Sequence, residues 1–119
     1  MTLVLEVYRT SQSFPRDETY GLTSQLRRAA VSVPSNIAEG QERLSTGEFK
    51  HFLGNARGSL MEVETQVVIA RELGYLDPQR SEELLDMTAE VGRILNGLLS
   101  SLASRGIQSD HRSLATGHC

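Results

Sequence analysis

The sequence predicts an all-α protein, an antiparallel up-down bundle of four helices. Three long segments repeat apolar residues every three or four positions, which is the period of an amphipathic helix. Short connectors separate these segments, so neighbouring helices should run antiparallel. Aromatic residues make up only 5% of the chain and tryptophan is absent, which favours a core of aliphatic side chains.

The first segment, residues 2–12, cannot be assigned by periodicity, because its apolar residues fit strand alternation and helical spacing equally well. In a bundle it would supply the fourth helix. A connector begins with residues 14–18 and ends at Gly21. The next helix should begin near residue 22, with Thr23 or Ser24 as its cap.

The second helix carries Pro34 near the middle of its amphipathic pattern. Proline removes the amide that would bond the carbonyl of Ala30, and its ring crowds that carbonyl, at a cost of roughly 3 kcal/mol. The hydroxyls of Ser32 and Ser35 can bond the backbone groups loosened there. We therefore predict a Pro-kinked helix. Its apolar face should consist of Leu22, Leu26, Ala30, Val33, Ile37 and Leu44.

The third helix should start at a capping box formed by Ser45 and Glu48 and run for about 28 residues, roughly 42 Å, until Gly74 stops it. Its long, regular pattern makes it the clearest element of the chain. Its buried face should consist of Phe49, Phe52, Ala56, Leu60, Val63, Val67 and Ala70.

The last helix should begin at Asp77 and Pro78, because aspartate caps helices and proline suits the first helical position. It should end near Ser104. We predict a bundle domain over residues 1–104 and a disordered tail over residues 105–119, which are polar and have no period. The buried face of this helix should consist of Leu84, Thr88, Val91, Leu95, Leu98 and Leu102.

Composition narrows the class of protein. The formal net charge of −3 argues against a domain that coats nucleic acid by charge alone. Cys119 is the only cysteine, so no disulfide can form within the chain and nothing points to an oxidising compartment. No segment has the length and apolarity of a membrane span, and the N-terminus does not have the pattern of a signal peptide. We expect a cytoplasmic protein.

Four stretches carry a family resemblance within a region from about Leu3 to Leu102. They are residues 20–30 (YGLTSQLRRAA), 33–40 (VPSNIAEG), 56–62 (ARGSLME) and 74–76 (GYL). Together they resemble the small bacterial four-helix bundle proteins encoded in intervening sequences of 23S ribosomal RNA genes. The resemblance implies a bundle whose members tend to form homopentameric barrels. It also implies kinship to the accessory proteins of diversity-generating retroelements, which partner a reverse transcriptase and nucleic acid.

Members of that family usually continue for about a dozen residues upstream of the point where Met1 lies. We therefore expect a shortened first helix of about 12 residues, roughly 18 Å long. Part of the bundle groove would then be uncovered, as an assembly surface or an aggregation liability. A start codon placed too far downstream is an equally economical explanation.

Glu48 and His51 have the i, i+3 spacing found in di-iron bundles. That architecture needs two such pairs and two further glutamates, whereas His111 and His118 lie in the predicted tail. We expect no metal site and no cofactor, and a solvated histidine beside a capping glutamate. No histidine is spaced to serve as a base for Ser32, Ser35 or Ser59, so the protein is predicted not to be an enzyme.

Polar residues interrupt the apolar pattern of the second and third helices. We predict a partly buried polar network of Asn36, Glu39 and Glu62, joined by Arg27 or Arg28, which would fix helix pairing and register. A ligand or catalytic pocket around Glu39 and Glu62 is the alternative.

Five basic residues of the same two helices, Arg27, Arg28, Arg43, Lys50 and Arg57, are candidates for a rim that contacts nucleic acid or a protein partner. Ordinary surface charge, balanced by neighbouring glutamates, is the alternative. A true phosphate-binding surface would bind RNA with an affinity that falls steeply as salt rises.

Two functional classes follow. The first is a non-enzymatic scaffold that self-assembles into a homo-oligomer, expected to be a pentamer, through exposed apolar and small-residue helix faces. The second is a nucleic-acid-binding or reverse-transcriptase accessory module, with RNA, DNA or a reverse transcriptase as partner and no contact with a membrane. The spacing of Gly54 and Gly58 predicts close packing of helices, and Gly58 with Ser59 should let another helix approach, such as the kinked one.

Overall fold

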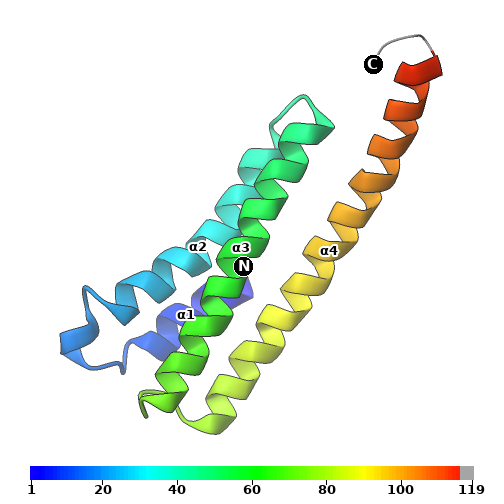
Figure 1. Cartoon of the computed structure of the whole chain (residues 1–119). Coiled ribbons are helices and arrows are strands. Elements are labelled where there is room, and N and C mark those ends of the chain that lie inside the picture. Colours follow the sequence, from blue (N-terminus) through cyan, green and yellow to red (C-terminus); the bar gives the residue numbers. More distant parts are fainter. Residues whose placement is uncertain (116–119) are drawn as a thin grey trace.

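The structure, a computed structural model, describes the backbone of residues 1–115 and the side chains of residues 1–103. Neighbouring helices run antiparallel (Figure 1). Helix α2 packs on α3, α3 packs on α4, and α1 contacts both α2 and α4. The predicted all-α four-helix bundle is confirmed. Its elements are α1 (Thr2–Ser11), the 3-10 helix η1 (Arg16–Glu18), α2 (Leu22–Gln41), α3 (Thr46–Glu72) and α4 (Pro78–Ala115).

The segment whose periodicity fits both strand and helix forms α1, a helix of 10 residues. It buries Leu3 and Val7 against the other helices. Its first residue lies about halfway along the bundle, so α1 covers only the half that contains η1 and the α3–α4 turn (Figure 1). The predicted shortened first helix is confirmed. In the other half of the bundle, α2 and α4 are not covered by α1 (Figure 1).

The predicted ends of the long helices are set by side chains and one glycine. The Ser45 hydroxyl accepts a hydrogen bond from the Glu48 amide at 3.1 Å, as the capping box predicts. At the start of α4, Asp77 Oδ1 accepts from the Arg80 amide at 2.8 Å. Gly74 has a φ of 79°, the left-handed conformation that glycine adopts without strain after a helix. These local signals therefore define the α3–α4 turn.

The predicted cap of α2 is wrong. Gly21 is the N-cap residue and has no side chain to supply a cap, while Thr23 and Ser24 lie inside the helix. The Glu18 carboxylate of η1 accepts from the Leu22 amide at 3.2 Å and takes over the capping role. A carboxylate at a helix N-terminus also interacts favourably with the helix dipole. The η1 turn makes this contact, which spacing along the sequence does not reveal.

The core is aliphatic, as the composition predicts. The predicted faces are confirmed for most positions, but Leu44 is fully exposed at 104% because α2 ends before it. Leu53 is fully buried, whereas Phe52 is only half-buried. Leu98 is 37% exposed. The central buried residues are Leu3, Val7, Leu26, Ala30, Val33, Leu53, Ala56, Leu60, Val63, Val67, Ala70, Leu84, Leu95 and Leu102.

Helix α4 continues past Ser104 to Ala115, so the predicted helix end is wrong. Propagating a helix adds one hydrogen bond for each residue that is fixed, and no proline follows Pro78 to stop it. The division into a domain of residues 1–104 and a tail of residues 105–119 stays a prediction, and residues 116–119 lie outside the described part. No helix among the described residues combines the length and apolarity that crossing a membrane requires.

Pro34 lies inside α2, which continues as one helix on both sides of it. The Asn36 side-chain amide donates to the Ser32 carbonyl oxygen at 2.8 Å and to the Ser32 hydroxyl at 2.9 Å. The carbonyl that Pro34 leaves without a helical donor is that of Ala30, so the bonds of Asn36 to Ser32 do not replace the missing one. Among the described hydrogen bonds, the hydroxyls of Ser32 and Ser35 donate to no backbone group, so the predicted compensation does not appear there.

Arg80 of α4 forms hydrogen bonds with two residues of α1. Its guanidinium donates to the Glu6 carboxylate, to the Thr10 hydroxyl at 2.9 Å and to Glu83 Oε2 at 3.0 Å. The hydrogen bonds from Arg80 and Arg9 hold the pKa of Glu6 below its ordinary value. This ion pair adds to the burial of Leu3 and Val7 in holding α1 against the bundle.

The Glu6–Arg80 pair predicts acid sensitivity. A carboxylate whose pKa is lower in the folded state stabilises the fold at neutral pH, and this contribution is lost as pH falls below 4.5, the ordinary pKa of glutamate, and through the lowered pKa of the folded state. Glu6→Gln should therefore lose less stability over this range than the wild type does. Glu64→Gln, which removes an exposed carboxylate of α3 that forms no described ion pair, is the control. Urea unfolding at a series of pH values measures both slopes, and equal slopes for wild type and Glu6→Gln would contradict the prediction.

Candidate functional site

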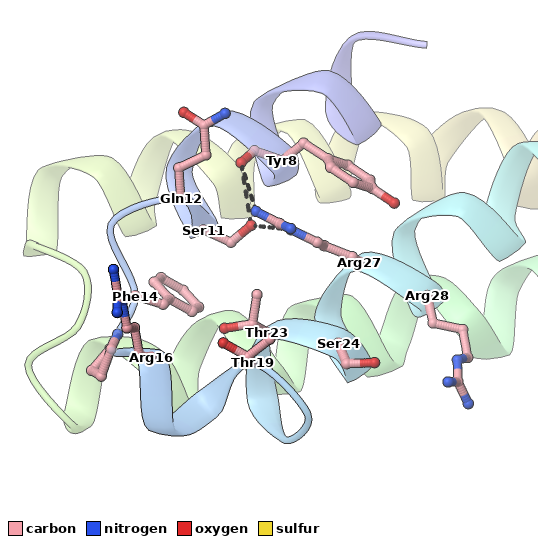
Figure 2. A pocket seen from close by; sticks show the side chains of 11 residues that line it. Tyr8, Ser11, Gln12, Phe14, Arg16, Thr19, Thr23, Ser24, Arg27 and Arg28 are labelled. Atoms are coloured by element: carbon pink, nitrogen blue, oxygen red, sulfur yellow. Dashed lines mark hydrogen bonds between the residues drawn. The ribbon is translucent and has the colours of Figure 1, made fainter.

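A hollow of about 590 Å³ lies where the end of α1, the η1 turn and the first turns of α2 meet (Figure 2). We call it the α1–α2 hollow. The described side chains that line it include no carboxylate. They comprise the rings of Tyr8 and Phe14, the hydroxyls of Ser11, Thr19, Thr23 and Ser24, and three arginines, Arg16, Arg27 and Arg28, together with Gln12 and Pro15.

Arg27 crosses the middle of this hollow (Figure 2). Its Nε donates to the Ser11 hydroxyl at 2.8 Å, and its Nη2 donates to the Tyr8 carbonyl oxygen at 3.4 Å. The guanidinium carbon lies 4.8 Å from the centroid of the Tyr8 ring, within the range of a cation–π contact. Arg27 is half-buried and forms none of the ion pairs among the described residues. It joins α2 to α1 and keeps an uncompensated charge.

Arg16 and Arg28 lie toward opposite ends of the hollow, on either side of Arg27, and both are exposed (Figure 2). Thr23 lies on its wall and is only 8% exposed. The Thr23 hydroxyl oxygen is buried and has no hydrogen-bond partner. The sequence pattern indicated Thr23 only as a possible helix cap and did not single out Arg16, because the fold of η1 and the start of α2 brings both residues to the hollow.

The other predicted basic residues lie elsewhere. Arg43 pairs with Glu39, and its guanidinium carbon is 4.8 Å from the Phe52 ring centroid. Arg57 Nη1 donates to Asn96 of α4 at 3.3 Å, and Lys50 lies in the first turns of α3. Along α2, Arg28 and Arg43 are separated by roughly 22 Å at 1.5 Å per residue. The five cations therefore form separate groups, with Arg27 and Arg28 together at one end.

The polar network between α2 and α3 has other members than predicted. The Ser59 hydroxyl donates to the Ser32 hydroxyl at 2.9 Å, and Asn36 bonds the same hydroxyl. Glu39 is exposed and pairs with its helical neighbour Arg43, while Glu62 is also exposed. Of the predicted network only Asn36 takes part, because Glu39 and Glu62 lie at exposed positions of their helices, whereas Ser32 and Ser59 lie where α2 and α3 meet. Glu62 lines a polar groove of about 320 Å³ between α2 and α3, and Glu39 does not.

Glu48 and His51 are both exposed in the first turns of α3. His51 Nε2 lies 3.4 Å from Asn55 Nδ2, and its ring meets the Phe52 ring edge-on with centroids 5.5 Å apart. Within the described residues, no group of three histidine, cysteine, aspartate or glutamate side chains is placed to hold a metal ion. The geometry therefore places His51 among surface contacts of α3.

The outward side of α3 is free of charge over much of its length. Five residues share this side because they follow one another at intervals of three or four, and we call it the outer face of α3. Met61 is 64% exposed and Ile69 is 42% exposed. A side chain added at either glycine would meet nothing within 4 Å, so the predicted packing of Gly58 against another helix of this chain is wrong. The outer face of α3 consists of Gly54, Gly58, Met61, Thr65 and Ile69.

Antiparallel helices around an aliphatic core, with the candidate binding features on the outside, define a small four-helix bundle protein. A sequence model of the 23S rRNA-intervening sequence protein family matches residues 1–97. The chain belongs to this family, and the resemblance carried by its sequence motifs is confirmed.

A solved structure shares the fold. It is a protein of unknown function from the S23 ribosomal protein family of Bacteroides thetaiotaomicron, with a TM-score of 0.71. The two sequences are 18% identical, and the match covers 81% of this chain and 87% of that chain. At this identity the comparison shows the fold alone. No protein among the curated sequences matches this chain.

Proposed function

We propose that this protein is a non-enzymatic scaffold that assembles into a homo-oligomer through the outer face of α3. The observation that carries the proposal is that this face combines exposed Met61 and Ile69 with two glycines that point into open space. Protein interfaces are depleted in charged residues at their centres and enriched in methionine. Glycines on a helix surface allow a second helix to approach closely, so the face suits a helix of another copy.

A second exposed apolar surface of the same molecule supports a second copy as the occupant. On α4, Ile94 is 56% exposed and Leu98 is 37% exposed. Large aliphatic side chains on one surface complement the glycines on the other. An interface between two different surfaces is heterologous, and heterologous contacts form a ring when the rotation from one copy to the next closes. This arrangement agrees with the homopentamer that the family resemblance implies.

Replacing Gly58 with leucine should convert the assembly to monomers. The new side chain meets nothing within 4 Å of its Cβ in the same chain, so it should leave the bundle intact and block only a neighbouring helix. Ser35→Leu, which adds the same side chain to the exposed side of α2, is the matched control. Native mass spectrometry and light scattering measure the stoichiometry.

We expect a wild-type oligomer of five copies, the same oligomer for Ser35→Leu, and monomers for Gly58→Leu. A wild type that is monomeric at tens of micromolar contradicts the scaffold proposal. A Gly58→Leu variant that assembles like the wild type excludes the outer face of α3 as the interface. A different closed stoichiometry would keep the scaffold and reject the pentamer.

A nucleic-acid-binding or reverse-transcriptase accessory module is the second candidate function. The observation that favours it is the position of Arg27 and Arg28 beside the carboxylate-free α1–α2 hollow. A reverse-transcriptase gene next to the gene of this protein would support it, and an isolated gene would favour the scaffold alone.

A further inference from the structure

The α1–α2 hollow gathers positive charge that no carboxylate in its lining neutralises. Arg16, Arg27 and Arg28 are its only charged lining residues. Asp17 and Glu18 of η1 are not among the lining residues, and the two oxygens of Glu18 accept from the Leu22 amide and from the Tyr75 hydroxyl. Glu62 lines the neighbouring groove together with Arg28. The chain as a whole has a net charge of −3, so this local excess runs against the overall balance. We propose that the hollow binds a phosphate group.

Arg27 is the anchor of the proposed site. A guanidinium has five N–H donors, and the Ser11 hydroxyl and the Tyr8 carbonyl oxygen take two of them. The remaining donors belong to a half-buried group, which Tyr8 and Ser11 hold in one orientation. A fixed guanidinium with free donors matches the geometry of a phosphate group, which it can bond through two parallel hydrogen bonds.

The first turn of α2 adds two features that favour an anion. The amides of the first turn have no carbonyl partner within the helix, and the helix dipole places partial positive charge there. Glu18 occupies the Leu22 amide only. Thr23, which is 8% exposed, lines the hollow with a hydroxyl that has no hydrogen-bond partner. Buried polar atoms are normally satisfied, so this hydroxyl points to a partner that binds in the hollow.

The volume of the hollow indicates the size of the ligand. At about 590 Å³ it falls within the range of small-molecule sites and exceeds what a free phosphate ion needs. The ligand is therefore a phosphate group with room for the group that carries it. A phosphorylated small molecule and the backbone of a nucleic acid present the same chemistry, and the proposal does not depend on the oligomeric state.

Titration of the full-length protein with inorganic phosphate at constant ionic strength, followed by amide NMR spectra, tests the site. We expect saturable shifts confined to residues 8–28. A parallel titration with a 12-nucleotide RNA identifies the source of the phosphate group. Shifts of the same residues by RNA, with an affinity that falls steeply as salt rises, point to a nucleic-acid backbone, whereas saturation by phosphate alone points to a small ligand.

Two variants and one control separate binding from folding. Arg16→Gln combined with Arg28→Gln should weaken binding roughly tenfold or more, since two charge-assisted contacts are removed. Thr23→Val should weaken it several-fold while the protein unfolds at the same or a higher temperature, because the lost hydroxyl has no partner in the protein. Arg93→Gln removes an exposed arginine of α4 and should bind like the wild type.

Three outcomes would overturn the proposal. The first is an absence of saturable shifts with both phosphate and RNA in low salt. The second is shifts spread evenly over the charged surface. The third is binding by the double arginine variant as tight as that by Arg93→Gln, which would mean that Arg16 and Arg28 do not contact the ligand.

Discussion

Leu53→Ala is expected to lower the free energy of unfolding by about 2–5 kcal/mol, the range measured when a large aliphatic side chain is removed from a packed core. Leu53 is fully buried in α3, the helix that packs on both α2 and α4. The neighbouring helices cannot close a cavity there without losing their own contacts. Circular dichroism during urea unfolding measures the change.

Leu44→Ala is the matched control, because it removes the same atoms from a residue that is 104% exposed. It should change the free energy of unfolding by less than about 0.5 kcal/mol. All variants must be compared at one protein concentration, since assembly makes apparent stability depend on concentration. Similar losses for the two variants would mean that Leu44 is buried after all, as the sequence pattern predicts, and would contradict the end of α2 at Gln41.

Leu44 and Leu53 show where the helical repeat predicts burial and where it does not. Within the interior of α3 the predicted face holds from Ala56 to Ala70, because every residue obeys one helical repeat. Past the end of a helix, the repeat no longer predicts which residues are buried. Leu44 follows the spacing of α2 but lies in the loop after it. Leu53 keeps the repeat of α3, three residues before Ala56, but Phe52 was predicted in its place because a spacing of four residues fits a helix face as well as a spacing of three.

The helix caps also fall into two groups, those set by neighbouring residues and one set by the fold. Ser45, Gly74 and Asp77 act within three or four residues of their own position, so the sequence predicts them. The cap of α2 comes from Glu18, whose position depends on the fold of η1. The start of α2 was thus predicted at the right residue with the wrong capping group.

The candidate site depends on contacts far apart in the sequence. Arg27 and Arg28 were predicted as surface cations, yet Arg27 bonds α1 across 16 residues, and its side chain crosses the hollow. Asn36 was predicted in a polar network, but its partners are serines rather than carboxylates. Charge and polarity identify residues that need partners. Only the packing of the helices decides which partners they find.

Gly40→Ala is expected to destabilise the protein although it replaces glycine inside a helix. A Cβ at this position would lie 2.9 Å from Phe49 Cδ1 and 2.9 Å from Phe52 Cβ. The Phe49 ring can turn, but the Phe52 Cβ is fixed to the backbone of α3, so the two helices must separate. Overpacking of this kind costs about 1–3 kcal/mol, against a gain of at most about 1 kcal/mol from the better helix propensity of alanine.

Gly97→Ala isolates the propensity term, because a Cβ there meets nothing within 4 Å. It should raise the free energy of unfolding by about 0.5–1 kcal/mol, so the two variants should shift the unfolding transition in opposite directions. A larger side chain at this position gives a second test. Gly40→Val must displace α3 farther, so it should lower the free energy of unfolding more than Gly40→Ala does. If Gly40→Ala instead stabilised the protein like Gly97→Ala, α2 and α3 would not approach as closely as the structure describes. This contact would then not explain the glycine that ends the motif at residues 33–40.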